Sequence, residues 1–219
     1  MEKHGYGQWR PRDLQDGYDH VAEDYAHQFW DELAKKPFDR MMLDWLAEKV
    51  NGSGVICDLG CGPGQIARYL HGRGVQVCGV DLSPAMVKQA RRLNPDIAFQ
   101  QGNMLALTDV ADNLYGGIAA FYSIIHIPRA LVVEALRELS RVLRPQGSIL
   151  LTFHIGQQIK HLDEWWGKKV SLDFIFFETE EMKGYLKAAG FGLEEVIERE
   201  PYPEVEVQTR RAYIFAKKR

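Results

Sequence analysis

Long apolar segments are missing from this chain of 219 residues. A helix that spans a bilayer needs roughly 20 consecutive apolar residues. The longest stretch without Asp, Glu, Lys or Arg, residues 113–128, is interrupted by two adjacent glycines and by His126. The chain begins MEKHGY, and no apolar segment follows these first charges, which is not typical of a secretory signal. We therefore expect a cytoplasmic protein that neither crosses nor binds a membrane.

Cysteine is scarce, and neither sign of charge dominates. Cys57, Cys61 and Cys78 are odd in number and lack the CxxC spacing of metal or redox sites, so we expect reduced thiols and no bound metal. Lys and Arg total 27 against 30 Asp and Glu, which gives a net charge of −3. This balance disfavours the basic surface with which proteins bind nucleic acids or anionic lipids.

Short apolar segments alternate with segments of helical period from residue 55 onward, as is typical of a parallel sheet covered by helices. Five segments are nearly continuous in apolar residues and predict buried parallel strands: 55–60, 75–81, 97–103, 116–123 and 148–154. Two further strands are expected near the end of the chain, at 193–200 and 210–218. Pro201 and Pro203 lie between them, so we expect a loop there rather than a tight hairpin.

Helices are predicted from apolar residues that recur at helical spacing, at 84–93, 131–142 and 179–189. Ser83 and Thr179 are the expected N-caps of two of them, and Gly190 is the expected stop. Two amphipathic segments precede residue 55, one from Tyr18 to Phe29 and one from Phe38 to Leu46. They predict a helical cap on the sheet.

A glycine-rich turn, DLGCGPGQ at 58–65, follows the first predicted strand. In an open α/β sheet the carboxyl ends of the strands receive the ligand, and glycine permits a tight turn and close backbone approach there. The glycines are spaced GxGxG, and Gln65 stands where the third glycine of a dinucleotide fingerprint would fall. Asp81 ends the second strand, where a carboxylate accepts hydrogen bonds from ribose hydroxyls. Either adenosine or a dinucleotide fits this pattern.

Four motifs in register resemble the class I S-adenosylmethionine-dependent methyltransferases: DLGCGPG at 58–64, VDLS at 80–83, QGNM at 101–104 and RVLRPQG at 141–147. The resemblance covers most of the chain. It implies S-adenosylmethionine as cofactor and S-adenosylhomocysteine as product. It also implies an α/β, Rossmann-like fold: a seven-stranded, mostly parallel sheet with an antiparallel last strand, helices on both faces and an N-terminal helical cap.

One domain, 1–219, is expected to hold all of these parts. We divide it into a helical cap at 1–51, a cofactor-binding core at 52–155, a substrate-lid insertion at 156–178, and a C-terminal helix with an antiparallel strand pair at 179–219. The insertion is rich in aromatic residues, among them Trp165, Trp166 and Phe174. These rings form either an aromatic wall for an apolar or cationic acceptor or part of the core.

The resemblance implies roles for single residues. The loop 60–64 would pack under the cofactor, Asp58 would reach its amino group, and Asp81 would hold the ribose hydroxyls. Asn103 stands where the family more often has Asp, and its side-chain oxygen can still accept from the adenine amino group. The expected cofactor contacts are Tyr18, Tyr25, Asp58, Gly60, Cys61, Gly62, Gly64, Asp81, Leu82, Met86, Gly102, Asn103, Met104, Tyr122 and Ser123.

Each of these residues also has a purely structural interpretation. The glycines can serve a tight turn alone, Asp81 can cap the helix that begins at Pro84, and Asn103 can be an ordinary loop residue. The cysteines suit small core positions, and Tyr18 and Tyr25 suit buried packing.

His126 is the candidate general base because it follows the fourth strand and its ordinary pKa lies near neutrality. Methyl transfer needs a base only when the acceptor starts as a hydroxyl or a protonated amine. A hydrogen bond to the backbone at a helix entrance is the alternative for His126. His154 ends the fifth strand and is a second candidate.

Motifs of three acceptor classes are missing. The segment after the fourth strand reads FYSI at 121–124, without the Asp/Asn-Pro-Pro-Tyr or Pro-Cys motif of base and glutamine methylases and without clustered carboxylates for a metal-assisted site. We expect a small-molecule acceptor, and no nucleic acid. Arg210 and Arg211 can grip an anionic acceptor, but alternation along a strand sends only one of them to a given face, and an exposed, solvated Arg is the favoured interpretation. A non-catalytic cofactor-binding protein and, less favoured, an NAD(P) oxidoreductase stay as alternatives.

Overall fold

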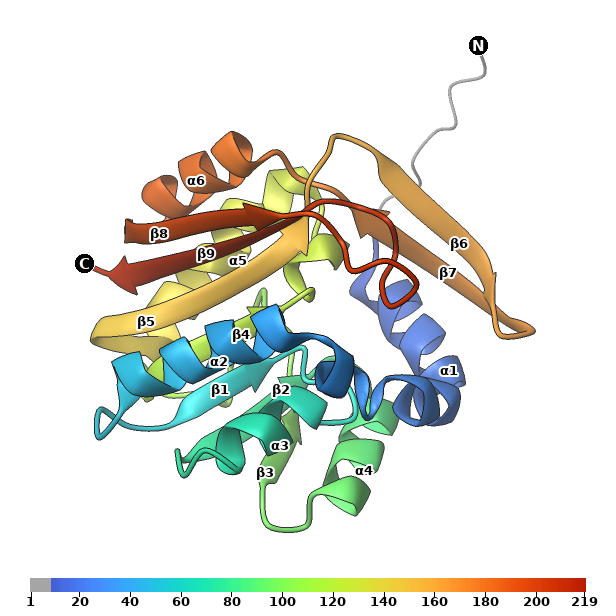
Figure 1. The fold of residues 1–219 in the computed structure, drawn as a ribbon, viewed down its shortest axis with the longest axis horizontal. Helices are drawn as coiled ribbons and strands as arrows, with labels where there is room; N and C mark the ends of the chain where they lie inside the picture. The colour runs from blue at the N-terminus through green and yellow to red at the C-terminus, as the bar shows by residue number, and fades with distance from the viewer. Residues whose placement is uncertain (1–8) are drawn as a thin grey trace.

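The computed structural model of the protein describes residues 9–219 as one sheet with helices on both faces and a separate hairpin (Figure 1). The segment MEKHGY, on which the expectation about a secretory signal depends, lies outside these residues. The strands are β1 (Ile56–Leu59), β2 (Val77–Asp81), β3 (Ala98–Gln101), β4 (Tyr115–Phe121), β5 (Leu143–His154), β6 (Ile159–Trp165), β7 (Lys168–Ile175), β8 (Phe191–Arg199) and β9 (Arg211–Lys218).

Helices and strands alternate through the first half of the chain, as the sequence predicts. The helices are α1 (Pro11–Phe29), α2 (Pro37–Val50), α3 (Gln65–His71), α4 (Pro84–Leu93), α5 (Arg129–Val142) and α6 (Thr179–Ala188), with short 3-10 turns η1 (Glu32–Lys35) and η2 (Ile124–His126). In the part of the chain that is described, no helix is both long and apolar enough to cross a membrane.

The main sheet has seven strands in the order β3-β2-β1-β4-β5-β9-β8. Neighbouring strands from β3 to β5 are parallel, and β9 runs antiparallel to both β5 and β8. The expected Rossmann-like fold, with an antiparallel last strand, is confirmed. Because the strand order reverses between β1 and β4, their carboxyl ends diverge and leave a crevice for a ligand.

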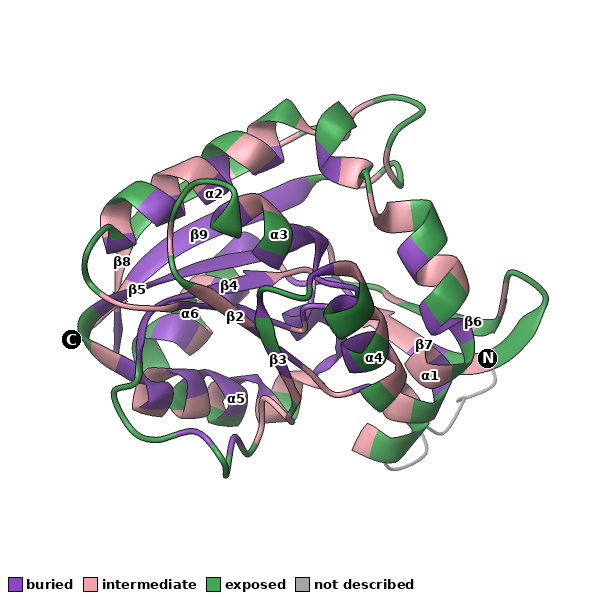
Figure 2. Cartoon of the chain, turned by 90° about the horizontal axis from the view of Figure 1, so that it is seen from below, coloured by how far each residue is buried: buried purple, intermediate pink, exposed green. Residues whose placement is uncertain are grey.

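Two apolar layers cover the two faces of the sheet (Figure 2). Successive side chains of a strand point to opposite faces, so Ile149 and Leu151 of β5 pack with α5 and α6, while Leu150 packs with α2 and α3. On β9, Ile214 packs in the layer with α5 and α6, and Phe215 packs in the layer with α2 and α3. All five side chains are fully buried, which explains why these strands are nearly continuous in apolar residues.

The helix α4 begins at a double cap. The Ser83 hydroxyl accepts a hydrogen bond from the Met86 amide at 3.0 Å, as expected of an N-cap. The carboxylate of Asp19, on α1, accepts from the Ser83 hydroxyl at 2.5 Å and from the Ala85 amide at 3.1 Å. This contact fixes the N-terminal helix against the end of β2, beside Asp81.

Three sequence expectations are wrong in detail. Residues 156–178 form a hairpin, β6 with β7, that the sequence does not reveal because its strands carry charges on both faces. The N-cap of α6 is Glu178, in a capping box with Glu181, and Thr179 is the first helical residue. Strand β5 begins at Leu143 rather than at 148, with an irregularity in its pairing to β4.

Candidate functional site

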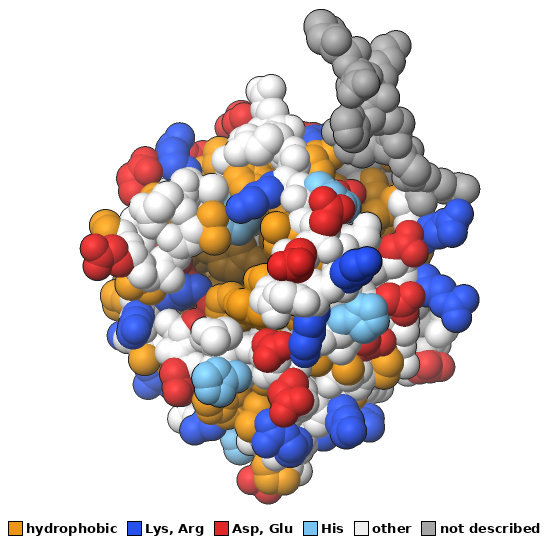
Figure 3. Space-filling view, turned by 90° about the vertical axis from the view of Figure 1, so that its right-hand side faces the viewer, with side chains coloured by type: hydrophobic (Ala, Val, Ile, Leu, Met, Phe, Trp, Pro, Cys, Tyr) orange, Lys and Arg blue, Asp and Glu red, His pale blue; other side chains and the backbone are white. Residues whose placement is uncertain are grey.

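A cavity of about 530 Å³ lies at the carboxyl ends of β1, β2 and β4. The helix α1, the hairpin β6–β7 and the β8–β9 connection, residues 200–210, contribute its other walls. Figure 3 shows a hollow whose floor is hydrophobic and whose rim carries charged groups of both signs. The cavity is therefore large enough for a small ligand and mostly apolar, with a few polar groups that can orient what it binds.

The glycine turn after β1 forms one wall of the cavity. Gly60 has a φ of +73°, and a Cβ atom at this position would lie 2.3 Å from the Cβ of Ser123. Only glycine fits, because the backbone is left-handed and the neighbouring strand end is too close for a side chain. Gly64, with a φ of +87°, starts α3 and does not line the cavity, so its visible role is in the turn.

Asp81 connects the end of β2 to this turn. One carboxylate oxygen accepts from the Gly62 amide at 2.7 Å, and the other accepts from the Ser83 amide at 2.8 Å. The pKa of Asp81 is raised to about 6, chiefly by burial and also by the nearby charge of Asp19, against the hydrogen bonds from the two amides. The carboxylate lines the cavity and is held rigidly by two backbone amides. Ser83, and not Asp81, caps α4.

Two buried polar atoms beside the turn lack a hydrogen-bond partner among residues 9–219. They are the Ser123 hydroxyl oxygen and the side-chain carbonyl oxygen of Gln65, and both residues line the cavity. A buried polar atom without a partner costs free energy. A polar ligand in the cavity would satisfy both of them.

Most of the expected cofactor contacts lie together in this cavity. Those that line it are Tyr18, Tyr25, Gly60, Cys61, Gly62, Asp81, Leu82, Met86, Gly102, Asn103, Met104, Tyr122 and Ser123. Asp58 lies behind the turn, where it accepts from the Ala67 amide at 3.0 Å and burial raises its pKa to about 8. Its expected contact with a ligand stays a prediction. The Asn103 side-chain oxygen accepts from the Leu105 amide at 3.0 Å.

His126 lines the cavity with a fixed orientation. Its Nδ1 donates to the backbone carbonyl of Asp173, on β7, at 2.8 Å, so in the neutral ring Nε2 is the acceptor. The Tyr18 hydroxyl lies 2.7 Å from Nε2 and donates to it. Burial lowers the pKa of His126 to about 4, so the imidazole is neutral near pH 7.

Aromatic rings of α1 and the hairpin close over this part of the cavity. Trp165 packs edge-on against Tyr25, with ring centroids 5.7 Å apart, and against Phe174 at 5.9 Å. It also stacks on Trp166 at 4.6 Å. Trp165 and Phe174 line the cavity, whereas Trp166 is 40% exposed and does not.

Arg211 corrects a sequence expectation, because it is buried and lines the cavity. Its guanidinium donates to the backbone carbonyls of Thr209 at 2.6 Å and Val207 at 3.0 Å. Arg210, the residue before β9, is exposed as expected. Sequence reasoning also missed the ionisable residues Glu32, Lys36, Asp39 and Glu206, which line the same cavity and come from segments without a motif.

A parallel sheet whose first strand ends in a GxGxG turn, beside a buried acidic residue on the second strand, defines a nucleoside-binding α/β protein. Residues 56–147 match the family described as "Methyltransferase domain". A ubiquinone biosynthesis O-methyltransferase of Alkalilimnicola ehrlichii is 26% identical over 137 residues, 58% of this chain and 55% of that protein. A malonyl-[acyl-carrier protein] O-methyltransferase of Enterobacter lignolyticus is 27% identical over 143 residues, 64% and 53% of the two chains.

This chain spans just over half the length of each of these curated relatives. Two solved structures described as S-adenosylmethionine-dependent methyltransferases have the same fold. The one from Methanosarcina mazei has a TM-score of 0.67 at 17% identity and covers 75% of this chain and 92% of its own. The one from Clostridium acetobutylicum has a TM-score of 0.66 at 16% identity and covers 90% and 98%. Residues 56–147 of the protein therefore match a methyltransferase domain, and the chain has the fold of these S-adenosylmethionine-dependent methyltransferases.

The cavity fits S-adenosylmethionine, the cofactor that the resemblance of the four sequence motifs implies. The rigid carboxylate of Asp81 suits a ribose, and the side chains of Leu82, Met86 and Met104 suit the faces of an adenine. The partnerless oxygens of Ser123 and Gln65 suit the polar end of such a ligand. The turn at Gly60 lets the backbone approach closely.

Proposed function

We propose that this protein transfers the methyl group of S-adenosylmethionine to a small molecule. The observation that carries this proposal is one cavity whose walls include both Asp81 and Gly62 and, in addition, His126 and His154. Both reactants would thus bind in one space, in which an acceptor can be aligned with the methyl group.

Bound S-adenosylmethionine supplies a methyl carbon that its sulfonium already activates. The residues of the chain therefore have to position the acceptor and exclude water. The Asp24 carboxylate on α1 pairs with Lys168 on the hairpin at 2.6 Å, and His20 contacts the Lys169 carbonyl at 3.1 Å. These contacts hold α1 and residues 156–178 together over the cavity, which supports the proposed role of that insertion as a substrate lid.

Tyr18 and His126 would together take up the proton of a hydroxyl or ammonium acceptor. Because Nε2 of His126 already accepts from Tyr18, the acceptor's proton passes to the Tyr18 oxygen as the Tyr18 proton passes to Nε2. The Asp173 carbonyl then stabilises the imidazolium through Nδ1. His126 is thus the proposed base, and Tyr18 is the group that faces the acceptor.

Small-molecule specificity, the absence of a nucleic-acid partner and a cytoplasmic location belong to this proposal. The charge balance of the chain supports the first two. A non-catalytic cofactor-binding protein would keep the Asp81 end of the cavity but would have no use for the paired Tyr18 and His126. An oxidoreductase is disfavoured by Gln65 in place of the third glycine.

Isothermal titration with S-adenosylmethionine, S-adenosylhomocysteine, NAD and NADP tests the proposal. We expect binding of the two sulfur ligands alone, followed by release of S-adenosylhomocysteine when an acceptor library is added. Binding of a nicotinamide nucleotide instead, or of none of the four, would overturn the proposal. Binding without turnover on any acceptor would support the non-catalytic alternative.

A further inference from the structure

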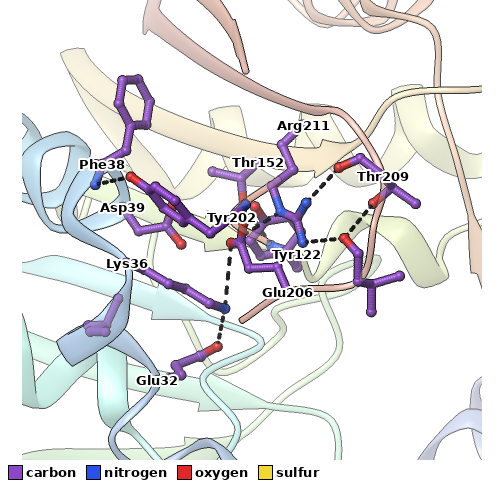
Figure 4. A network of polar contacts seen from close by, with 12 residues as sticks. Glu32, Lys36, Phe38, Asp39, Tyr122, Thr152, Tyr202, Glu206, Thr209 and Arg211 are labelled. Carbon is purple, nitrogen blue, oxygen red and sulfur yellow. Dashed lines mark hydrogen bonds and ion pairs between the residues drawn. The ribbon is translucent and has the colours of Figure 1, made fainter. Parts of the chain in front are cut away.

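A buried polar network borders the cavity beyond Tyr122 (Figure 4). Its centre is Glu206, in the β8–β9 connection, whose carboxylate is inaccessible to solvent. The network joins α2, β9 and this connection. One member, Glu32, accepts from Gln65, which follows the glycine turn, whereas Lys36, Glu206 and Arg211 are not among the cofactor contacts described above.

The carboxylates of this network already have partners. Both oxygens of Glu206 accept from the Arg199 guanidinium, at 2.7 and 2.9 Å, and one also accepts from the Tyr202 amide at 2.8 Å. Asp39 accepts from the Tyr213 hydroxyl and from Arg199. Glu32 accepts from Gln65 at 2.9 Å and from Lys36 at 2.5 Å. These acids have little capacity left for a ligand.

The cations of the network have donors to spare. The Lys36 ammonium carries three N–H groups and makes one hydrogen bond, to Glu32, while its distance to Glu206 is 3.9 Å. The Arg211 guanidinium carries five N–H groups and makes two hydrogen bonds, both to backbone carbonyls. Its Nε lies 3.3 Å from the same Glu206 oxygen that Lys36 faces. The two cations therefore flank one point of the cavity wall.

The charged groups around His154 indicate a positive electrostatic potential in this part of the cavity. The pKa of His154 is lowered to about 3, chiefly by burial and also by the charges of Arg211 and Lys36, against the opposite effect of Glu206. The imidazole is neutral and stacks on Phe176, with centroids 5.2 Å apart, and against Tyr122 at 5.0 Å. An apolar, flat surface thus adjoins two cations, the buried Arg211 and the half-buried Lys36.

We propose that the methyl acceptor is a small organic acid whose anionic group binds Lys36 and Arg211 and whose apolar body lies against Tyr122, His154 and Phe176. This inference rests on the proposed function, since it assigns the acceptor end of the same cavity. Buried donors left without a partner discriminate strongly between ligands, because a neutral analogue cannot satisfy them.

Three probe molecules of similar shape test whether the acceptor carries a negative charge. Benzoate, benzamide and benzylamine share one ring and carry a negative, a neutral and a positive group. Each is titrated into the protein saturated with S-adenosylhomocysteine. We expect benzoate to bind at least about tenfold more tightly than benzamide, the scale of one hydrogen bond to a charged group, and benzylamine to bind more weakly than either.

The chain offers neighbouring controls for both cations. Lys36→Met and Arg211→Met are expected to lose the preference for benzoate, whereas Lys35→Met and Arg210→Met, at exposed neighbouring positions, are expected to keep it. Affinity for S-adenosylhomocysteine, measured first in each variant, reports folding. If Arg211→Met fails to fold because residues 200–210 lose an anchor, Lys36→Met still carries the test.

The outcomes separate this inference from the proposed function. Failure of the unaltered protein to bind S-adenosylhomocysteine would overturn the proposed function. Binding of S-adenosylhomocysteine with equal affinity for benzoate and benzamide, with tighter binding of benzylamine, or with no binding of benzoate at millimolar concentration would overturn the anionic acceptor alone. Retention of the benzoate preference in Lys36→Met would also overturn it.

Discussion

The hydroxyl of Tyr18 lies 2.7 Å from Nε2 of His126, although 108 residues separate the two in the chain. The contact joins the N-terminal helix α1 to the 3-10 turn η2, which follows β4, and both residues line the cavity. Because Nδ1 of His126 is fixed on a backbone carbonyl, this pair has one hydrogen-bonding arrangement in its neutral form. The proposed proton transfer depends on it.

Tyr18→Phe removes the hydroxyl and keeps the ring packing. We expect turnover on a hydroxyl or ammonium acceptor to fall by about 10²-fold or more, the lower range for loss of general acid–base catalysis, with cofactor affinity nearly unchanged. His126→Gln is expected to lower turnover similarly. Steady-state kinetics with the acceptor, together with titration of S-adenosylhomocysteine, measures both effects. Unaltered kcat in both variants would leave the pair a purely structural role.

The pH dependence of turnover provides a second check on the same pair. The pKa of His126 is about 4, so the imidazole is neutral above this value and becomes a donor at Nε2 below it. We expect the rate to be flat with respect to this group between pH 6 and pH 8 and to fall as the pH approaches about 4. A rate that instead rose through the ordinary histidine pKa of about 6.5 would show that His126 is solvated during turnover.

Asp81→Ala is expected to weaken the binding of S-adenosylhomocysteine by about 1 to 3 kcal/mol, the scale of lost hydrogen bonds to a charged group. The substitution also releases the Gly62 amide, so the glycine turn loses one of its anchors. Isothermal titration measures the loss, and Asp109→Ala, at an exposed position away from the cavity, serves as the control. If both variants bind S-adenosylhomocysteine with equal affinity, Asp81 stabilises the glycine turn and does not bind the ligand.

Substitutions at Gly60 and Gly74 distinguish two free-energy costs of adding a side chain, the backbone strain and the steric clash. Both have positive φ, +73° and +80°, but a Cβ at Gly74 would meet nothing within 4 Å, whereas at Gly60 it would lie 2.3 Å from Ser123. Gly74→Ala is expected to lower the free energy of unfolding by about 1 kcal/mol through backbone conformation alone. Gly60→Ala is expected to cost more and to weaken cofactor binding, with partial recovery in Gly60→Ala/Ser123→Gly. Urea unfolding tests the order.

Asp58 predicts a pH dependence of stability. Its pKa is about 8 in the folded chain and near 4 when unfolded, so the folded state binds more protons between these values and stability falls as the pH rises. Asp58→Asn keeps an oxygen for the Ala67 amide and removes this ionisation. We expect the variant to gain stability relative to the unaltered protein by at least about 1 kcal/mol between pH 5 and pH 8. Urea unfolding at both pH values measures the difference, and a constant difference would contradict the raised pKa.

The sheet and the glycine turn could be predicted from the sequence because their constraints are local. Strands buried on both faces, such as β4, are nearly continuous in apolar residues, and the turn after β1 needs glycine at fixed positions. The hairpin β6–β7 could not be predicted because its strands are partly exposed on both faces. Neither hydrophobic alternation nor a continuous apolar run marks such strands.

The acceptor end of the cavity could not be predicted for a different reason. Lys36, Glu206 and Arg211 are far apart in sequence and meet only when α2 packs beside β9. A charged residue in a loop reads as solvated unless its partner is known. By contrast, the adjacent positions of Arg210 and Arg211 did predict that only one of them would lie on a given face, and Arg211, the first residue of β9, is the one that lines the cavity.

Asp19 makes the N-terminal helix both a cover of the cavity and a part of the next helix, because its carboxylate completes the first turn of α4. A movement of α1 away from the cavity would take that acceptor from the Ser83 hydroxyl and the Ala85 amide. Opening of the cavity would thereby be linked to fraying of the first turn of α4. Ligand exchange should then slow as this cap is strengthened, and amide hydrogen exchange at Ala85 would report how often the cavity opens.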